Sequence, residues 1–476
     1  MSKKLHTLFP KVPTGIAGLD EVTNGGFPAG RSTLICGSAG CGKTLFGLQF
    51  LVKGILEYDE PGVFMSFEET KKDLAMNVSS LGFDLGKMMA NGKLHIDQVA
   101  INKSEIEETG EYDLEGLFIR LGYAIDSIGA KRVVLDTIES LFGGIQNSAV
   151  LRSEIRRLFQ WLKDKGVTAL ITGEKGDKTI TRQGLEEYVS DCVILLDFRV
   201  VEQIATRRLR IVKYRGSTHG TNEYPFLIDD KGISVLPITS LKLENKSSEE
   251  VISTGLPQLD DLFGKGGIFR GSGMLITGTA GTAKTILAAY FAAGSCKRKE
   301  QTLYFSFEES PDQLVRNMKS VGIDLKPYMR SKLLHIHASR PSLQGLELHL
   351  LKLHKLIEQH NPSTVIVDPI SSLVTIGSIG EVRDMLIRLI DLLKVKEITA
   401  YFTALTHEYL NHDLTVNAVS SLADIWINVS NPMENDDRVR SLSIIKSRGM
   451  GHDSRKKQFM IGSKGIRFSD LTDEKK

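Results

Sequence analysis

Two glycine-rich segments of this chain have the residue types of a phosphate-binding loop. They are GSAGCGKT, residues 37–44, and GTAGTAKT, residues 278–285. In such a segment between a strand and a helix, backbone N–H groups surround phosphate oxygens, the lysine reaches the β- and γ-phosphates, and the threonine hydroxyl binds Mg²⁺. The expected nucleotide ligands are Gly37, Ser38, Ala39, Gly40, Cys41, Gly42, Lys43 and Thr44, together with Gly278, Thr279, Ala280, Gly281, Thr282, Ala283, Lys284 and Thr285.

The second segment has Ala283 where the first has Gly42. An alanine is accepted where the loop enters the helix if its backbone φ stays negative, whereas a glycine with a positive φ could not be replaced in this way. We therefore expect a negative φ at Ala283 and nucleotide binding at both segments.

Carboxylates end two apolar runs that come later in each half. Asp136 closes RVVLD and Asp368 closes TVIVD, so each would lie beside a phosphate loop and hold a metal ion directly or through water. Each could instead be a solvent-exposed carboxylate at the end of a strand. The expected metal ligands are Thr44, Asp136, Thr285, Glu308 and Asp368.

Two pairs of adjacent glutamates, Glu68–Glu69 and Glu308–Glu309, follow the strand after each loop helix. At the carboxyl edge of a parallel sheet, one carboxylate can orient or deprotonate a nucleophile in line with the γ-phosphorus while its neighbour stabilises that setting. These four residues are the expected catalytic groups. The alternative is that each pair opens the following helix, since acidic residues favour a first helical turn.

Two basic pairs, Lys213 with Arg215 and Lys446 with Arg448, come near the end of each half. Fixed positive charge stabilises a transferring phosphoryl group. If these residues serve the phosphates, a neighbouring subunit of a closed ring can donate them. The alternative is that they are surface cations without a role in catalysis.

The elements that must position these residues occur twice. PTGIAGLD at 13–20 returns as STGLPQLD at 253–260, FMSFEET at 64–70 as YFSFEES at 304–310, and KYRGSTH at 213–219 as KSRGMGH at 446–452. The offsets stay between 232 and 241 residues, so the chain is a tandem duplication. We expect a first domain at 1–243, a polar linker at 244–250 and a second domain at 251–476.

Short apolar runs alternate with helical patterns in each half. The runs RSTLICG, GVFMSF, KRVVLD, VTALITG and CVILLDF of the first half return as GMLITG, QTLYFSF, TVIVD, ITAYFTAL and DIWINV. Nearly continuous apolar strands separated by helices predict a mostly parallel sheet with helices on both faces. The predicted fold class is α/β, with two P-loop NTPase domains in tandem.

The composition favours a cytoplasmic protein. A formal charge of +2 gives no overall positive charge that would favour a nucleic-acid or membrane partner. The four cysteines show no CxxC spacing, which suggests unpaired thiols in a reducing compartment. The sequence shows neither a signal peptide nor an apolar run long enough to span a bilayer.

Together these residues resemble the KaiC family, the double-domain RecA-like ATPases and autokinases of circadian systems. The resemblance rests on GRSTLICGSAGCGKTLFGLQFL, EPGVFMSFEET, LRIVKYRGSTHGTNEYPF, FSFEES and KSRGMGHD. It implies two RecA-like domains in a homohexameric double ring with Mg²⁺ and ATP between subunits, where Lys213, Arg215 and His219 reach a neighbour's nucleotide. Further implied nucleotide contacts are Ser80, Tyr214, Ser217, Asp229, Asp230, Arg440, Lys446, Ser447 and Arg448.

In that family the first domain is a slow ATPase and the second phosphorylates two adjacent hydroxyl residues, which correspond here to Ser420 and Ser421 in AVSSLAD. Taken alone, two serines would indicate an ordinary turn or helix cap. Serine at both positions, where the circadian relatives have serine and then threonine, resembles a noncircadian branch of the family.

Three positions depart from the family pattern. Ala283 replaces a glycine, and Val321 and Gly451 stand where tryptophans are expected, so base stacking at the second site should be weaker. The chain also stops at FSDLTDEKK without the long extension to which KaiA binds, so regulation by KaiA is not expected and phosphorylation would be constitutive. A KaiB-like protein that docks on the first ring stays a candidate partner.

Two other functions stay open. In a nucleotide-gated signalling scaffold, ATP would mainly close the ring and catalysis would be residual. In a recombinase- or helicase-like motor, the shared RecA-like core would bind DNA, but the chain has no evident basic cluster beyond RRLR at 207–210. Phosphate transfer to Ser420 or Ser421 that is abolished by Glu308→Gln would separate the autokinase from the scaffold.

Overall fold

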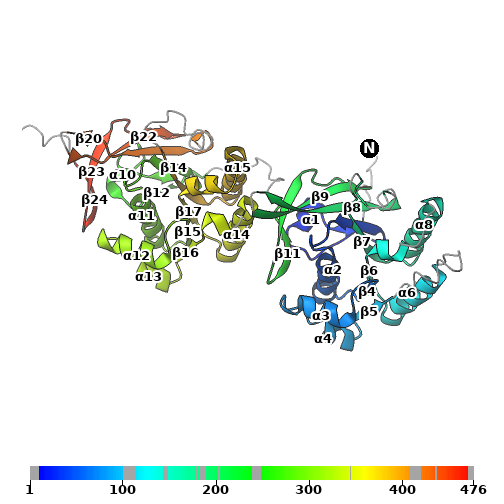
Figure 1. The fold of residues 1–476 in the computed structure, drawn as a ribbon. Helices are drawn as coiled ribbons and strands as arrows, with labels where there is room; N and C mark the ends of the chain where they lie inside the picture. The colour runs from blue at the N-terminus through cyan, green and yellow to red at the C-terminus, as the bar shows by residue number, and fades with distance from the viewer. Residues whose placement is uncertain are drawn as a thin grey trace, which may run out of the picture. The chain divides into compact units, whose positions relative to one another are not determined.

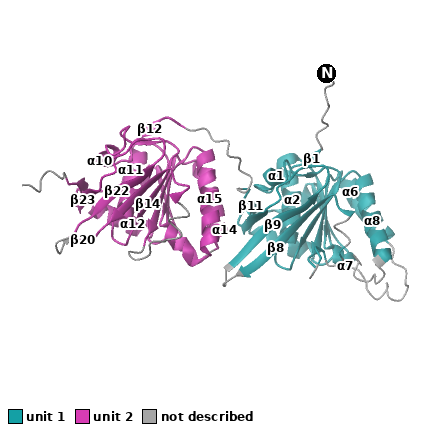
Figure 2. Ribbon diagram, turned by 90° about the horizontal axis from the view of Figure 1, so that it is seen from above, with its two compact units in different colours: residues 1–240 teal, residues 241–476 magenta. Residues whose placement is uncertain are grey.

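The computed structural model describes residues 10–99, 114–142, 148–176, 179–181, 184, 189–201, 204–237, 248–343, 345–406, 420–434 and 437–469. The chain divides into two compact units, residues 1–240 and 241–476 (Figure 2). Of the linker predicted at 244–250, only 248–250 fall within the described ranges.

A nine-stranded sheet forms the centre of the first unit. Its strands are β3 (Ser32–Gly37), β4 (Gly62–Ser66), β5 (Leu94–Gln98), β6 (Arg132–Asp136), β7 (Thr168–Glu174), β8 (Cys192–Val201), β9 (Ile204–Tyr214), β10 (Glu223–Asp229) and β11 (Gly232–Val235). Their order across the sheet is β11-β10-β9-β8-β3-β7-β6-β4-β5. The strands from β8 to β5 are parallel, and β9, β10 and β11 extend the sheet in antiparallel pairs. A two-stranded sheet pairs β1 (Lys11–Val12) with β2 (Phe27–Pro28).

Helices cover both faces of this sheet (Figure 1). They are α1 (Leu19–Val22), α2 (Lys43–Tyr58), α3 (Lys71–Ser79), α4 (Leu85–Ala90), α6 (Glu115–Ile128), α7 (Ile138–Phe142) and α8 (Ser148–Asp164). Side chains alternate between the faces along each strand, which divides the core in two. Ile35 of β3 belongs to the cluster of α2, whereas Leu34 and Cys36 belong to the cluster of α6 and α8.

The second unit repeats this architecture. Its sheet has the order β16-β15-β17-β18-β14-β19-β22-β23-β24, so β14 takes the central place of β3. The strands are β14 (Gly273–Gly278), β15 (Thr302–Ser306), β16 (Leu334–Ala338), β17 (Thr364–Asp368), β18 (Thr399–Leu405), β19 (Ile425–Ser430), β22 (Ser441–Ser447), β23 (Lys457–Gly462) and β24 (Gly465–Phe468). Two short pairs join β12 (Val251–Ile252) with β13 (Ile268–Phe269) and β20 (Met433–Glu434) with β21 (Asp437–Arg438).

Helices of the second unit also lie on both sides of its sheet, with α11 on one face and α14 and α15 on the other (Figures 1 and 2). They are α10 (Pro257–Asp260), α11 (Lys284–Lys297), α12 (Pro311–Ser320), α13 (Lys326–Arg330), α14 (Leu346–His360) and α15 (Ile379–Val395), with 3₁₀ turns at Pro341–Leu343 and Ile370–Thr375. The α/β prediction of two mostly parallel sheets with helices on both faces is confirmed. No helix in the described ranges has the length and apolar character to cross a membrane.

Candidate functional site

The first phosphate loop leaves β3 at Gly37 and enters α2 at Lys43. The buried Lys43 donates from Nζ to the carbonyl oxygens of Gly37 at 2.8 Å and Ser38 at 3.2 Å. Within the described part of the chain, the backbone N–H groups of Gly40, Gly42 and Lys43 donate no hydrogen bond. The loop therefore presents unused donors beside a buried lysine, which is the donor arrangement that phosphate oxygens require.

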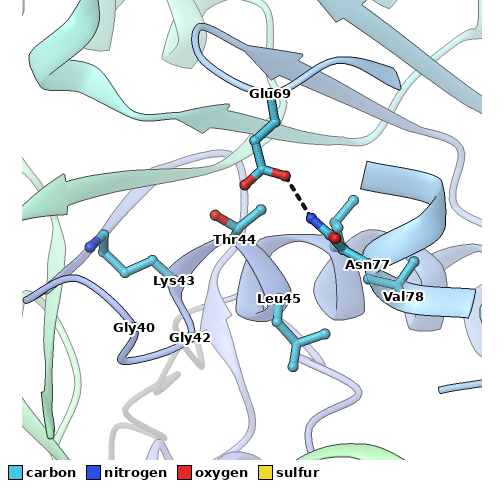
Figure 3. A pocket seen from close by; sticks show the side chains of 9 residues that line it. Gly40, Gly42, Lys43, Thr44, Leu45, Glu69, Asn77 and Val78 are labelled. Carbon is cyan, nitrogen blue, oxygen red and sulfur yellow. Dashed lines mark hydrogen bonds between the residues drawn. The ribbon is translucent and has the colours of Figure 1, made fainter. Parts of the chain in front are cut away.

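A pocket of about 270 Å³ opens beside this loop, and Figure 3 shows Thr44 and Glu69 facing it. Glu69 accepts a hydrogen bond from Asn77 Nδ2 at 2.9 Å, which ties the carboxylate to α3 (Figure 3). Burial is the main cause of a raised pKa at Glu69, and the nearby Asp136 acts in the same direction. The lining residues are Gly40, Gly42, Lys43, Thr44, Leu45, Leu48, Glu69, Asn77 and Val78.

Asp136 ends β6 next to the loop and is 5 % exposed. Thr44 Oγ1 donates a hydrogen bond to its Oδ2 at 2.8 Å, and the Thr172 hydroxyl donates to its Oδ1. Burial raises the pKa of Asp136, although both threonine hydrogen bonds and the charge of Lys43 oppose that rise. A hydroxyl and a carboxylate thus meet at the loop, and these are oxygen ligands of the kind that Mg²⁺ prefers.

The first glutamate of each pair is held by hydroxyl groups from the segment that follows the neighbouring strand, which is β6 in the first unit and β17 in the second. Glu68 Oε1 accepts hydrogen bonds from Ser140 Oγ and from Thr137 Oγ1, the latter at 3.3 Å. Glu308 Oε1 accepts from Ser372 Oγ at 2.9 Å in the corresponding place of the second unit. These contacts aim both carboxylates along the carboxyl edge of the sheet, where the loops lie.

The alternative that each glutamate pair opens the following helix is wrong. The N-caps are Thr70 and Ser310, whose side chains accept from the backbone N–H of the third helical residue, and the helices begin one residue later. Both glutamates of each pair therefore precede the cap and lie outside the first turn.

The second loop repeats the arrangement of the first. Lys284 Nζ donates to the carbonyl oxygens of Gly278 at 2.8 Å and Thr279 at 2.7 Å. Burial lowers the pKa of Lys284 to about 8, against the raising effect of Asp368 and Glu308. The N–H groups of Gly281, Ala283 and Lys284 donate no hydrogen bond within the described ranges. The second loop therefore keeps the same unused donors as the first.

The expected negative φ at Ala283 is wrong. Ala283 has φ 84° and ψ 20°, close to the φ 103° and ψ 22° of Gly42. Both residues are the N-caps of their loop helices, so the loop imposes one left-handed conformation on whichever residue stands there. For a residue with a Cβ this conformation costs roughly 1–2 kcal/mol. The second loop therefore keeps its geometry at the expense of backbone strain.

Asp368 differs from Asp136 in one of its hydrogen-bond partners. The Thr403 hydroxyl donates to Asp368 Oδ1, as Thr172 donates to Asp136. The Oδ2 atom accepts from the hydroxyl of Tyr304 at 2.6 Å. Tyr304 is fully buried, and both burial and the neighbouring carboxylate raise its pKa, so it stays a hydrogen-bond donor.

The phosphate loop lies at the carboxyl end of the parallel strands, here called the loop edge. The basic pairs lie at the amino end of these strands, here called the basic edge. Gly37 lies beside Leu196 of β8, and Leu196 lies beside Leu209 of β9, whereas Tyr214, which follows Lys213, lies beside Cys192 at the other end of β8. Five strand residues from Leu209 to Tyr214 correspond to roughly 16 Å. Lys213 and Arg215 therefore lie too far away to contact the phosphates of their own loop.

The second unit has the same arrangement, because β22 is antiparallel to β19 and ends at Ser447 opposite Ile425. Lys446 Nζ donates to the carbonyl oxygens of Ser420 at 2.8 Å and Ala423 at 2.7 Å, and Arg448 donates to that of Ser421 at 2.7 Å. The basic pair thus contacts the two predicted phosphoacceptors through their backbone. Ser420 and Ser421 lie at the amino end of β19 and not beside the loop of their own chain.

Other predicted nucleotide contacts divide between the two edges. Arg440 lies at the loop edge, where its Nε donates to Gly281 O at 3.3 Å. Asp229 and Asp230 follow Ile228, whose side chain borders Gly42, so this acidic hairpin also lies at the loop edge. Ser80 is the exposed C-cap of α3, the helix that lines the pocket.

Ser217 and His219 lie with the basic pair at the opposite edge. Ser217 Oγ accepts from Lys11 Nζ at 2.7 Å, and His219 Nδ1 lies 2.9 Å from Gly220 O. Tyr214 is buried and its hydroxyl donates to Gly26 O at 2.8 Å, so its side chain is used within the first unit. Of the positions that depart from the family pattern, Val321 packs at the edge of the second core and the space around Gly451 is open.

Several residues around the sites escaped the sequence reasoning. The same residue type stands at the corresponding position of both halves, so aligning the two halves residue by residue would have identified them. They are Asn77 and Asn317, which donate to Glu69 and Glu309, Thr172 and Thr403, which donate to the two aspartates, and Ser140 and Ser372, which donate to Glu68 and Glu308. Tyr304 has no such signal because the first half has Phe64 in its place.

The residues at both loops fit a nucleotide with Mg²⁺. Unused backbone donors and a buried lysine suit phosphate oxygens, while the threonine and the aspartate suit a hard cation. Within the described ranges, no group of three or more His, Cys, Asp and Glu side chains could hold a metal ion. A magnesium ion at either loop would therefore take part of its coordination from the nucleotide and water.

Comparison with known proteins gives one family over nearly the whole chain. The family model of the KaiC ATPase matches residues 12–240 and again residues 252–473. The circadian clock protein KaiC2 of Synechocystis is 56 % identical over 458 residues, which cover 96 % of this chain and 81 % of that protein. The circadian clock oscillator protein KaiC of Synechococcus elongatus is 38 % identical over 468 residues, which cover 98 % of this chain and 90 % of that protein.

Proposed function

The chain belongs to the KaiC family of ATPases, and we propose that each half binds Mg·ATP and transfers its terminal phosphoryl group. In the first half the acceptor is water, and in the second half the acceptors are the hydroxyl groups of Ser420 and Ser421. Bound Mg²⁺ neutralises charge on the phosphates and supports their orientation.

The glutamates supply the base in this proposal. Glu68 orients the attacking water and accepts its proton. The water oxygen bonds to the γ-phosphorus, the bond from that phosphorus to the oxygen bridging to the β-phosphate breaks, and ADP departs. Glu308 does the same for a serine hydroxyl. Their support is the hydrogen bonding from Ser140 and Ser372, which holds each carboxylate at the loop edge. Lys43 and Lys284 exchange their carbonyl partners for phosphate oxygens.

The observation that carries the proposal is the location of the basic pairs at the sheet edge away from their own loop. Phosphoryl transfer needs positive charge on the far side of the γ-phosphate. A ring in which the basic edge of one subunit faces the loop edge of the next supplies that charge at every interface, and identical head-to-tail contacts form such a ring where the rotation between neighbours closes. We therefore propose a homohexameric double ring with a nucleotide at each subunit interface, and with the serines of one subunit presented to the loop of its neighbour.

The test combines two measurements on the full chain with ATP and Mg²⁺. Native mass spectrometry should give a hexamer, and phosphopeptide mass spectrometry should find phosphate on Ser420 or Ser421 that is lost in Glu308→Gln. A hexamer that binds ATP but leaves both serines unmodified would favour a nucleotide-gated scaffold. A monomer that hydrolyses ATP at full rate would contradict the shared site.

A further inference from the structure

The two metal-side aspartates are held by different groups, although their surroundings otherwise repeat. Asp136 Oδ2 accepts from Thr44 of the phosphate loop at 2.8 Å. Asp368 Oδ2 accepts from Tyr304 at 2.6 Å. Tyr304 occupies the position of Phe64 on the neighbouring strand, so this single substitution changes the partner of one carboxylate oxygen.

This difference changes the state of the loop threonine. In the first half the Thr44 hydroxyl is already a donor to Asp136. In the second half the Thr285 side chain makes no hydrogen bond within the described ranges, because Asp368 takes both of its protein donors, Thr403 and Tyr304, from the sheet. Both donors are fully buried, so the orientation of Asp368 does not depend on the loop.

We propose that Tyr304 is a positioning residue of the second site, which fixes the orientation of Asp368 for a divalent metal ion without help from the loop threonine. In the first site the Thr44 hydroxyl has to bind the metal through its oxygen while it also orients Asp136, so the position of the carboxylate depends on the loop. In the second site Asp368 is already held by Tyr304 and Thr403, and this fixed carboxylate therefore binds the metal of a metal–nucleotide complex more tightly. The inference rests on the proposed function, because it assumes that both loops hold such a complex.

The test uses Mn²⁺ as the probe, with ADP present and free Mn²⁺ measured by electron paramagnetic resonance. The second site is isolated in the full chain by Lys43→Ala, and the first by Lys284→Ala. In the isolated second site, Tyr304→Phe should raise the Mn²⁺ dissociation constant by roughly 3- to 10-fold, the range that one net hydrogen bond implies. The reciprocal change Phe64→Tyr in the isolated first site should lower that constant by a similar factor.

Tyr401→Phe is the matched control, because it removes one buried tyrosine hydroxyl of the same sheet. The ring of Tyr401 stacks on Phe291, and the Asp368 carboxylate takes its hydrogen bonds within the described ranges from Tyr304 and Thr403 instead. Its Mn²⁺ affinity should equal that of the unsubstituted chain. An affinity in Tyr304→Phe that is unchanged or tighter, while the unsubstituted second site binds Mn²⁺ with ADP, would overturn the role of Tyr304 alone. Absence of metal-dependent ADP binding at both isolated sites would overturn the proposed function and this role together.

Discussion

The first half forms its phosphate loop with Gly42 and the second forms the same loop with Ala283. The two residues have φ values of 103° and 84°, although only glycine adopts this region without strain. Surrounding contacts of the loop with its sheet and helix therefore outweigh the local preference of one residue. Strain retained beside a ligand site is consistent with a loop whose shape is needed for binding.

A second difference between the halves lies away from the loops, between the edge strand and the helix that covers it. In the first half Arg120 forms a bidentate ion pair with Asp97, with the closest contacts at 2.9 Å. In the second half His337 and Lys352 stand at these two positions, so a basic pair replaces an ion pair. Burial lowers the pKa of both residues, and the charge of Lys352 lowers that of His337 further.

A different ion pair of the covering helices α6 and α14 is present in both halves, so the difference in charge is local to the contact with the edge strand. Lys165 contacts Asp126 at 2.8 Å in the first half, and Lys396 contacts Glu358 at 2.6 Å in the second. The two halves thus share most of the contacts around their loops, with Tyr304 at Asp368 as an exception, and they differ in charges at the edge strand. The comparison predicts that removing the proposed base disables either half, whereas substitutions that affect stability or pH response act differently in the two halves.

The largest expected effect comes from removing the proposed base. Glu68→Gln should lower ATP hydrolysis at the first site by roughly 100-fold or more, because the amide cannot accept the proton. Glu308→Gln should abolish phosphate on Ser420 and Ser421 while hydrolysis at the first site continues. Phosphate release and phosphopeptide mass spectrometry measure the two effects separately.

The control for these variants is Glu57→Gln, which removes an exposed carboxylate that pairs with Lys53 on α2. It should leave both activities unchanged. Equal loss of both activities in either single base variant would break the assignment of one reaction to each half.

A smaller effect should follow from exchanging the two loop residues. Ala283→Gly relieves roughly 1–2 kcal/mol of left-handed strain in the folded state. The greater conformational entropy of glycine in the unfolded chain offsets about 0.4–1 kcal/mol of this gain. The free energy of unfolding should therefore rise by roughly 1 kcal/mol. For a unit of this size the thermal midpoint should rise by roughly 2–4 °C in calorimetry.

Gly42→Ala is the reciprocal change and should destabilise the first half by more than Ala283→Gly stabilises the second. The added Cβ would meet the same backbone strain and would also approach Ile228 Cδ1 to 2.8 Å. An unchanged or lower midpoint in Ala283→Gly would show that the loop of the second half is not strained.

The smallest expected effect is a pH response that is larger in the second half than in the first. Burial is the main cause of a pKa below the ordinary 6.5 at three histidines of the second half, His337, His354 and His360. The neighbouring charges of Lys352, Lys396 and His335, in that order, lower these pKa values further. Only Glu358 opposes the shift, at His354. Since the unfolded chain takes up these protons first, stability present above pH 6.5 is lost as the pH falls below it. In the first half burial and the charge of Lys71 lower the pKa of His95, and Asp97 opposes that shift.

Amide hydrogen exchange, corrected for its intrinsic pH dependence, can measure the edge strand and covering helix of each half separately. Between about pH 7 and pH 5, protection of β16 and α14 should fall more than that of β5 and α6. His337→Asp should restore an ion pair with Lys352 and reduce the difference, by up to about 1 kcal/mol. Parallel changes at both edges would contradict a role for the basic pair.

Much of the fold and part of the site follow from the sequence because the chain repeats itself. Buried parallel strands read as continuous apolar runs, and the loops, Asp136 and Asp368 occur at fixed places after them. The backbone conformation of Ala283 could not be read in this way, since a local rule for alanine says nothing of the contacts that impose its φ. The Tyr304 hydroxyl bond to Asp368 joins two strands, so it depends on register that a strand pattern does not give.

The most direct test of the shared site mixes two defective chains in a Lys284→Ala background, so that only first-half sites count. One chain carries Lys43→Ala, which removes the loop lysine, and the other carries Arg215→Ala, which removes the donated cation. Each alone should be inactive, and an equimolar co-assembly should regain ATP hydrolysis at about a quarter of its interfaces, where an intact loop meets an intact neighbour. Activity of the mixture that never exceeds the sum of the two separate chains would contradict sites completed by a neighbouring subunit.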